Sequence, residues 1–208
     1  KIDYLVKAWQ VVTMNETRDV IHNGAIAVNN GMILDVGKAD KIEALYEPKE
    51  VLGGSRFVLT PGMVNSHIHI TGEPLTRGYV PDDIDFAQNV FEWLCPLYSV
   101  YTAEEEKLSG QLAAVEMLKA GTTTFLEAGT CRFLEEIFEG LEEVGIRGRL
   151  GRWAWDLPPE PEVYKQNTDE AIGFLQSQLE TYKSIANGRL GAWSILVGHN
   201  TCSDPLWK

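Results

Sequence analysis

The stretch that decides the fold is FVLTPGMVNSHIHITGEPLTRG, Phe57–Gly78, in which an apolar run ends in two histidines one residue apart. Side chains of a β-strand alternate between its two faces, so His67 and His69 face one side and Ile68 faces the other. Their Cα atoms are then about 6.6 Å apart, a span from which two imidazole rings can converge on one cation. On the spacing alone, the pair is also compatible with two ordinary strand residues.

After residue 60 the sequence repeats the order strand, loop, helix. The stretches MVNSHIH, TTTFLEA, IRGRLGRWAW and RLGAWSILVG are typical of strands, and helical segments that end near Gly121, Gly145 and Gly188 separate them. This is the pattern of parallel βα units, and we count four strands. The histidine pair then lies at the carboxyl end of the first strand, where parallel barrels carry their chemistry.

Residues 1–59 have a different pattern. The alternating runs IDYLVKA, AIAV and MILDV predict strands, NNG predicts a tight turn, and KADKIEALY predicts one short helix. The Thr-Pro-Gly at residues 60–62 marks the change of pattern. We therefore expect a β-rich unit over residues 1–59 and a βα unit over residues 60–208.

The composition excludes several classes of partner. Thirty acidic and eighteen basic residues give the 208-residue chain a net charge of -12, with 44% of its residues apolar. Nucleic acid and anionic membranes attract basic surfaces, so neither is expected as a partner. The apolar runs are too short to span a bilayer and the first residues do not resemble a signal peptide, so we expect a cytoplasmic location.

Two further patterns predict structural roles. Cys95, Cys131 and Cys202 are widely spaced and odd in number, which argues against a disulfide framework or a thiolate zinc site and favours core positions. Thr102 is expected to cap a helix whose first turn carries the acidic run Glu104–Glu106, and this run is expected to be solvated.

These residues resemble the amidohydrolase superfamily. TPGMVNSHIH is similar to the strand that supplies the first two metal ligands of those enzymes. Four later segments are similar, in the same order along the chain, to segments of the subgroup of S-adenosylhomocysteine deaminases and chlorotriazine hydrolases. They are TRGYVPDDIDFAQNVFEWLCPLY, LKAGTTTFLEAG, EVGIRGRLGR and TCSDPLW. The resemblance covers nearly the whole chain. It implies that His67 and His69 bind one divalent metal, zinc or alternatively iron.

The resemblance implies an α/β fold: the amino-terminal half of a (β/α)8 TIM-type barrel, about four βα units, preceded by part of a small β-sandwich domain built from both chain ends. It also implies metal-dependent hydrolysis of a carbon–nitrogen bond, with a carboxylic acid that passes a proton to the departing amine. The expected reaction is deamination of an aromatic heterocycle such as a purine, pterin or triazine. An amide, urea or carbamate hydrolase of the superfamily is one alternative, and a non-catalytic binding or scaffold barrel is another.

The resemblance also implies parts that this sequence does not contain. In the superfamily a third metal histidine lies on strand five, a proton-handling Glu follows it, another histidine lies on strand six, and an aspartate lies on strand eight. We therefore expect no proton-shuttle residue within the 208 residues. The remaining carboxy-terminal half is expected to be required, in the same polypeptide or as a second chain. A small-molecule substrate and a homo-oligomer are also implied.

Four further residues are candidates for substrate contact. His199, in VGHNTCSD, either points into the site or is a loop histidine bonded to backbone. Arg152 either binds an anionic or carbonyl group or is a structural ion-pair partner. Trp155, together with Trp93, either forms the wall of a pocket for a flat ring or packs in the core.

Two other candidates follow the first two strands. Glu127, near the end of TTTFLEA, either accepts a hydrogen bond from a ligand histidine or is solvated. Arg77 belongs, with Asp82 and Asp83, to the long loop after the first strand, where it either borders the pocket or anchors the loop. The sequence does not identify the substrate, the metal or the oligomeric state.

Overall fold

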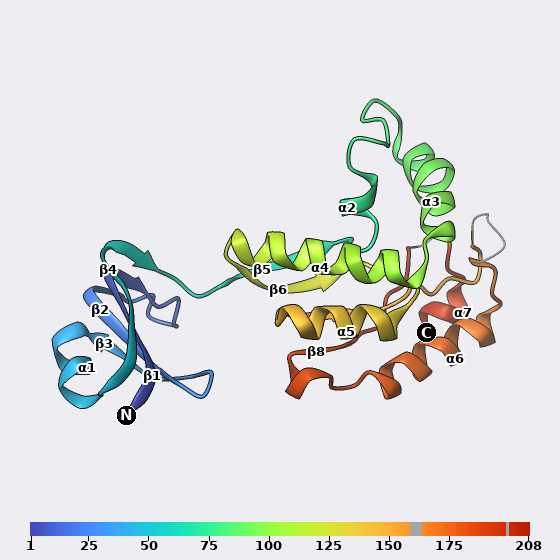
Figure 1. Ribbon diagram of the computed structural model, residues 1–208. Helices are drawn as coiled ribbons and strands as arrows, with labels where there is room; N and C mark the ends of the chain where they lie inside the picture. The colour runs from blue at the N-terminus through green and yellow to red at the C-terminus, as the bar shows by residue number, and fades with distance from the viewer. Residues whose placement is uncertain (159–163, 199) are drawn as a thin grey trace. The chain divides into compact units, whose positions relative to one another are not determined.

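The computed structural model describes residues 1–158, 164–198 and 200–208 (Figure 1). These residues form two compact units, Lys1–Gly62 and Met63–Lys208. The first unit is mainly β-structure, and the second alternates strands and helices, so the chain has a mixed α/β fold. None of the described helices combines the length and the apolar character that a membrane-spanning helix needs.

The amino-terminal unit is a four-stranded sheet in the order β3-β2-β1-β4. Its elements are β1 (Ile2–Val12), β2 (Val20–Asn29), β3 (Met32–Lys38), α1 (Ala39–Leu45) and β4 (Pro48–Leu59). β1 pairs antiparallel with β2 and parallel with β4, and β2 pairs antiparallel with β3. The three predicted strands and the short helix are confirmed. β4 begins earlier than the apolar run FVLT, because it pairs with β1 from Pro48 onward.

The second unit contains a parallel sheet in the order β5-β6-β7-β8. Its strands are β5 (Met63–Ile68), β6 (Thr122–Glu127), β7 (Arg147–Leu150) and β8 (Leu190–Ala192). The four predicted parallel strands are confirmed. The last two are shorter than expected, although an isolated parallel bridge between Ala154 and Leu196 continues their pairing.

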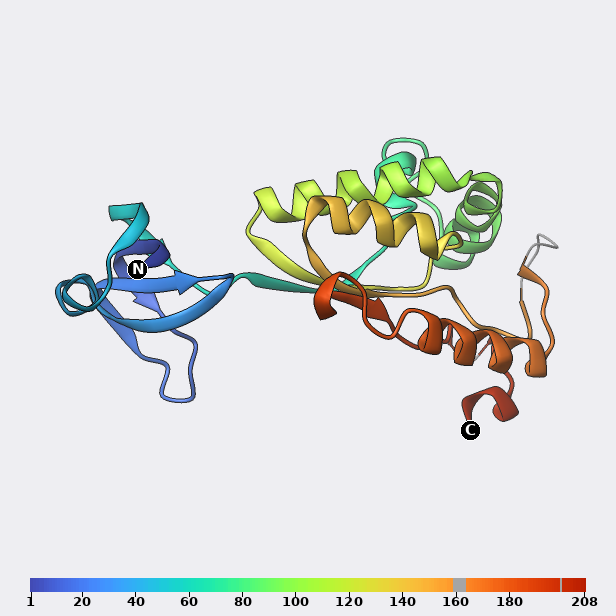
Figure 2. The ribbon, with the colours of Figure 1, turned by 60° about the horizontal axis from the view of Figure 1, so that its bottom comes forward.

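The helices of this unit connect and cover the strands. They are α2 (Glu73–Thr76), the π-helical segment η1 (Gln88–Leu94), α3 (Cys95–Val100), α4 (Ala103–Lys119), α5 (Leu134–Val144), α6 (Thr168–Thr181), the 3-10 turn η3 (Ala186–Gly188) and α7 (Asp204–Trp207). α4 and α5 lie side by side, and α6 precedes β8 (Figures 1 and 2). Thr102 caps α4 as predicted, and Gly145 ends α5 with a φ of 91°.

The main core of the second unit lies between the sheet and the pair α4 and α5. Ile70 is fully buried in this core, and Ile68 packs against it. The two isoleucines that alternate with the histidines therefore face the helices, as the strand pattern predicts. Cys95, Cys131 and Cys202 are free and buried, which confirms their expected core positions.

The acidic run at the start of α4 is not solvated throughout, and this corrects the sequence prediction. Glu105 completes a capping box with Thr102, but Glu106 is fully buried. The Glu106 carboxylate accepts hydrogen bonds from the backbone N–H groups of Arg132 and Phe133 at 2.8 and 3.1 Å. Residue 106 lies on the buried face of the helix, and burial raises the pKa of its carboxyl to about 7.

Candidate metal centre

His67, near the end of β5, and His69, the residue directly after β5, lie close together. Their ring centroids are 5.1 Å apart and the ring planes are nearly perpendicular, at 88°. His67 is exposed, whereas the side chain of His69 is 25% exposed. The alternation of the extended backbone therefore brings both imidazoles to one side of the strand, opposite the isoleucines that enter the core.

Glu127, the last residue of β6, lies next to His69. Its Oε1 is 3.8 Å from Nδ1 of His69, and its side chain is fully buried. The alternative that Glu127 is solvated is therefore wrong, because the parallel pairing of β5 and β6 places the carboxylate inside the unit. Within the described part of the chain, Nδ1 of His69 is buried without a hydrogen-bond partner.

The Glu127 carboxylate is held by the turn that follows it. Oε2 accepts from the backbone N–H of Gly129 at 2.5 Å, and Oε1 accepts from the N–H and the hydroxyl of Thr130 at 3.0 and 2.6 Å. The hydroxyl of Thr71 in turn donates to that of Thr130 at 2.9 Å. This buried chain of hydrogen bonds fixes the carboxylate facing His69.

The donor set fits part of a metal site. A carboxylate beside Nδ1 favours the imidazole tautomer that carries its proton there, which leaves Nε2 of His69 as a possible ligand. Zinc usually takes four ligands, and His67 and His69 can supply two of them. No group of three or more histidine, cysteine or acidic side chains suited to a metal occurs in the part of the chain that the structure describes.

A cavity of about 350 Å³ lies beside His69. Glu73 borders it and also accepts a hydrogen bond from the backbone N–H of His69 at 3.3 Å. Tyr98 is another lining residue, and burial together with the charge of Glu73 raises the pKa of its hydroxyl, which keeps Tyr98 neutral. The cavity thus combines an imidazole, a carboxylate and a neutral phenol.

Arg77 both borders this cavity and anchors its loop. Its guanidinium forms a bidentate ion pair with Glu116 of α4, with N–O distances of 2.9 and 2.8 Å. Asp82 of the same loop also lines the cavity. The two alternatives given for Arg77 are therefore compatible with one another, and its role toward a substrate stays a prediction.

Arg152 and Trp155 lie away from the cavity. The Arg152 guanidinium is 5.2 Å from the centre of the Phe174 ring on α6, so it faces the outer helix. Trp155 is fully buried and its ring N–H donates to the backbone oxygen of Tyr164 at 3.1 Å. Of the two alternatives given for Trp155, the structure supports packing in the core and contradicts a pocket wall, because a fully buried indole has no surface left for a ligand.

Trp93 and His199 complete the predicted set. Trp93 packs edge-on against Tyr79, with ring centroids 5.9 Å apart, and both line a separate cavity of about 330 Å³. Trp153, which neighbours Trp155, lies closer to the histidines, with its ring centroid 6.2 Å from that of His69. His199 falls outside the described residues.

Sequence reasoning did not find several residues around His69. Thr71 and Thr130 form the hydrogen bonds that support Glu127, and Glu73 and Tyr98 line the cavity. Threonine and tyrosine are common in strands and helices, so nothing in their spacing distinguishes these residues. For Glu73 a signal existed, because it follows the HIH motif by four residues in the loop expected to border the pocket.

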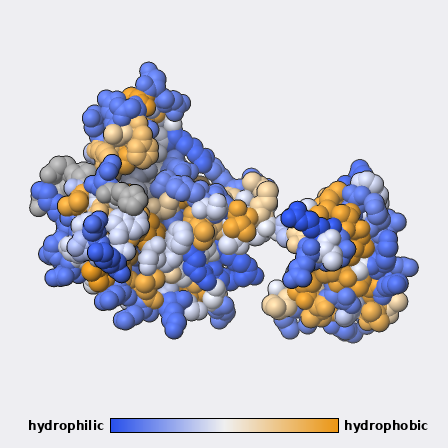
Figure 3. Space-filling view, turned by 180° about the vertical axis from the view of Figure 1, so that it is seen from behind, coloured by the Kyte–Doolittle hydropathy of each residue, from blue (hydrophilic) through white to orange (hydrophobic). Residues whose placement is uncertain are grey.

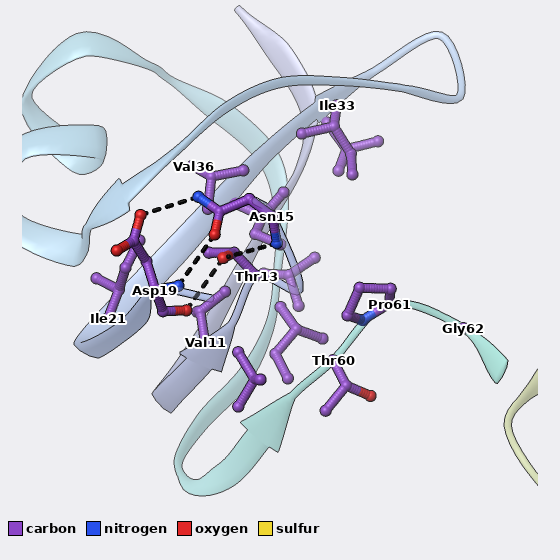
Figure 4. A pocket seen from close by; sticks show the side chains of 15 residues that line it. Val11, Thr13, Asn15, Asp19, Ile21, Ile33, Val36, Thr60, Pro61 and Gly62 are labelled. Carbon is purple, nitrogen blue, oxygen red and sulfur yellow. Dashed lines mark hydrogen bonds between the residues drawn. The ribbon is translucent and has the colours of Figure 1, made fainter. Parts of the chain in front are cut away.

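The amino-terminal unit has an apolar cavity of its own, of about 640 Å³ (Figure 4). Aliphatic side chains of the sheet line it, among them Val11, Ile21 and Ile33. At its rim the Asn15 amide donates to the Asp19 carboxylate at 2.9 Å. Apolar residues also gather on the surface of this unit (Figure 3), where Ile33 is 61% exposed. Within this unit, the described residues therefore leave one face of the sheet uncovered.

A sequence model of the amidohydrolase family matches residues 58–195, a range that contains the histidine pair and all four parallel strands. The chain belongs to the amidohydrolase family. This confirms the family that the PGMVNSHIH segment indicates. Because the match covers most of the second unit, the amidohydrolase assignment rests on the βα units as well as on the motif.

Among curated proteins, this amidohydrolase chain is similar to 5-methylthioadenosine/S-adenosylhomocysteine deaminase of Thermodesulfovibrio yellowstonii. The two are 34% identical over 184 residues, which cover 87% of this chain and 40% of that protein. The 208 residues thus span less than half the length of this relative.

Two solved structures share the fold. An adenosine deaminase from Xanthomonas campestris with bound zinc has a TM-score of 0.80 at 24% identity, and the match covers 94% of this chain and 43% of that one. A triazine hydrolase from Arthrobacter aurescens has a TM-score of 0.83 at 15% identity, over 100% of this chain and 49% of that one. The described fold therefore corresponds to somewhat less than half of each of these two structures.

Proposed function

We propose that this chain is the amino-terminal half of a metal-dependent hydrolase that deaminates an aromatic heterocycle. The observation that carries the proposal is the convergence of His67 and His69 beside the buried Glu127, in a chain that belongs to the amidohydrolase family. The names of the relatives support the substrate class, because the deaminases among them act on adenosine derivatives.

His67 and His69 are proposed to hold one divalent metal. The solved adenosine deaminase contains zinc, which favours zinc here, and iron is an alternative because imidazole suits both. Such a cation supplies Lewis acidity, which activates water for attack on an electrophilic carbon. Glu127 keeps His69 in the orientation and tautomer that a ligand needs, since its own position is fixed by Gly129 and Thr130.

The cavity beside His69 is proposed to admit part of the substrate. The carboxylates of Glu73 and Asp82 can accept hydrogen bonds from the polar edge of a heterocycle, and the Tyr98 hydroxyl can donate one to it. Arg77 borders the same cavity, and its ion pair with Glu116 holds the loop in place. We infer that these loop residues influence which ring is accepted.

The remaining machinery is proposed to come from a carboxy-terminal half, because the chain spans 40% of its deaminase relative. That half would complete a (β/α)8 barrel on the sheet β5-β6-β7-β8 and would supply the other metal ligands and a proton-transfer carboxylate. It would also cover the apolar face of the amino-terminal sheet, which fits a β-sandwich domain built from both ends of the protein.

A substrate panel tests the proposed reaction. The complete protein, loaded with zinc, is assayed for ammonia release from purine nucleosides, pterins and aminotriazines, and for cleavage of anilides, ureas and carbamates. We expect turnover of at least one heterocyclic amine and loss of that turnover in His69→Ala. Turnover of the second set alone would replace the deaminase assignment, and binding without turnover in either set would favour a non-catalytic barrel.

A further inference from the structure

Trp153, three residues after the end of β7, is buried beside the proposed metal centre. Its ring centroid lies 6.2 Å from that of His69, and the two ring planes meet edge to face at 76°. Aromatic rings favour this arrangement at such a separation. Two side chains therefore restrict the imidazole of His69, because the Glu127 carboxylate lies near its Nδ1 and the indole of Trp153 packs on its ring.

Trp153 also holds the turn that supports Glu127. Its indole N–H donates to the backbone oxygen of Ala128 at 2.5 Å, and its backbone N–H donates to that of Gly129 at 2.8 Å. The indole packs so closely on Gly129 that no Cβ fits between them. The Glu127 carboxylate receives its hydrogen bonds from Gly129 and Thr130 of this same turn. Trp153 thus contacts both the histidine and the turn that fixes its carboxylate neighbour.

Ala128 connects this indole to the strand of the histidines. While the oxygen of Ala128 accepts from Trp153, its N–H donates at 2.9 Å to the backbone oxygen of Ile68, which lies between the two histidines. The backbone oxygen of the preceding residue, Glu127, accepts from the indole N–H of Trp193 at 3.0 Å. Indole donors that follow β7 and β8 therefore hold the end of β6 where it pairs with β5.

Filling of the core does not account for both contacts of Trp153. A phenylalanine ring could also pack in the cluster with Tyr98 and Trp155, but it would leave the Ala128 oxygen without this donor. Trp155 provides the comparison, because its indole N–H donates to the backbone oxygen of Tyr164 and not to the turn after β6. Two tryptophans of one strand segment thus differ in what their N–H groups hold.

We propose that Trp153 is a positioning residue of the metal centre. Its indole holds the ring of His69 and the turn from Ala128 to Thr130 in one arrangement, so the imidazole and its supporting carboxylate keep their relative positions before a metal binds. Each of these contacts is made between described residues of the second unit. The inference rests on the proposed metal centre and not on the reaction that the complete protein catalyses.

Competition with a chromophoric chelator measures the zinc affinity of the complete protein. Trp153→Phe keeps a ring beside His69 but removes the indole donor, so the affinity should fall at least tenfold. Trp155→Phe is the matched control, because it removes a buried indole donor but keeps a ring beside Trp153, and its affinity should stay within twofold of wild type. Circular dichroism checks folding, and Trp153→Tyr takes the place of Trp153→Phe if that variant does not fold.

A spectroscopic measurement separates positioning from a general loss of stability. With cobalt in place of zinc, the visible absorption of the bound ion depends on the arrangement of its ligands. Trp153→Phe should shift these bands, whereas Trp155→Phe should leave them as in wild type. Wild-type affinity and bands in folded Trp153→Phe, or equal changes in both variants, would overturn this inference. Wild-type protein that takes up neither metal would instead overturn the metal centre, and this inference with it.

Discussion

His69 is bordered by two carboxylates of different character. Glu73 accepts the hydrogen bond of its backbone N–H and lines the cavity, whereas Glu127 is fully buried and lies 3.8 Å from Nδ1. A buried carboxylate costs free energy unless it is hydrogen-bonded, and Glu127 accepts three hydrogen bonds from Gly129 and Thr130. The site therefore has a rigid carboxylate behind the histidine and an accessible one at the cavity.

Glu127→Gln is expected to weaken zinc binding by about 10- to 100-fold, because an amide neither attracts the imidazole N–H as strongly nor accepts all three hydrogen bonds. Competition with a chromophoric chelator measures the affinity of the complete protein. Thr130→Val keeps the backbone N–H bond to the carboxylate but removes the hydroxyl, which donates to Glu127 and accepts from Thr71, so it should have a smaller effect in the same direction. Affinities within twofold of wild type for Glu127→Gln would contradict this role.

Gly129 is expected to be irreplaceable by alanine. Its φ is 111°, and an added Cβ would lie 1.7 Å from Cδ1 of Trp153. Gly129→Ala should therefore lower the free energy of unfolding by about 2 kcal/mol or more. Gly173→Ala on α6, where a Cβ meets no atom within 4 Å, is the control and should raise it by up to about 1 kcal/mol. Urea unfolding followed by fluorescence gives both values, and equal stabilities would contradict the packing described here.

The histidine pair was predictable from sequence because strand alternation is a strict local rule. His67 and His69 had to face one side, and Ile68 and Ile70 had to face the other, wherever the strand lay. The contact between His69 and Glu127 depends on the register of β5 against β6, which local rules do not set. The same limit applies to Trp155, since its burial depends on Tyr164 and other residues brought together by the fold.

At the scale of elements, Glu106 joins α4 to the start of α5. Its carboxylate accepts the backbone N–H groups of Arg132 and Phe133, which precede α5 and have no partner within that helix. The Arg132 guanidinium in turn donates to the backbone oxygens of Tyr98 and Ser99 at the end of α3. Three helices are thus tied together by one carboxylate and one guanidinium.

This contact predicts a dependence of stability on pH. Burial raises the pKa of Glu106 from 4.5 to about 7, so between these values the folded protein keeps a proton that the unfolded chain has lost. Its contribution to stability is complete below about pH 4.5 and falls as the pH rises to 7. This shift in the pKa of Glu106 corresponds to about 3 kcal/mol of unfolding free energy.

Glu106→Gln removes this titration. Urea unfolding measures the difference in unfolding free energy, wild type minus Glu106→Gln. This difference should fall by about 3 kcal/mol between pH 4 and pH 8. Glu104→Gln, at the exposed first turn of the same helix, is the control and should show no such trend. A constant difference between wild type and Glu106→Gln across this range would contradict the buried, protonated state.

Helices and strands were predictable from the sequence where a single local pattern of residues determined them. The four parallel strands, the helix α4 with its Thr102 cap and the Gly145 end of α5 follow from periodicity and end signals. The first half of β4 was missed, since PKEVLGGS contains charges and two glycines and forms a strand only through its pairing with β1. The burial of Glu106 was in principle predictable, because the small residues Gly110, Ala113 and Ala114 mark that face of α4.

At the scale of the whole molecule, the chain consists of two units that both leave surfaces for further structure. The sheet β5-β6-β7-β8 ends in the strands β5 and β8, and one face of the amino-terminal sheet is lined by exposed aliphatic residues. Relatives of the amidohydrolase family are more than twice as long. The family was predictable because PGMVNSHIH is specific, whereas nothing in the spacing of the residues that line the cavity beside His69 indicated a substrate.

The metal content of the complete protein with His67→Ala and His69→Ala combined tests the proposed metal centre most directly. After loading and removal of free metal, we expect about one zinc ion per wild-type polypeptide and almost none in the variant, which circular dichroism should show to be folded. His22→Ala, at a histidine of the amino-terminal sheet, should bind zinc like wild type. Stoichiometric zinc in the folded double variant would show that His67 and His69 are not the ligands and would contradict the proposed centre.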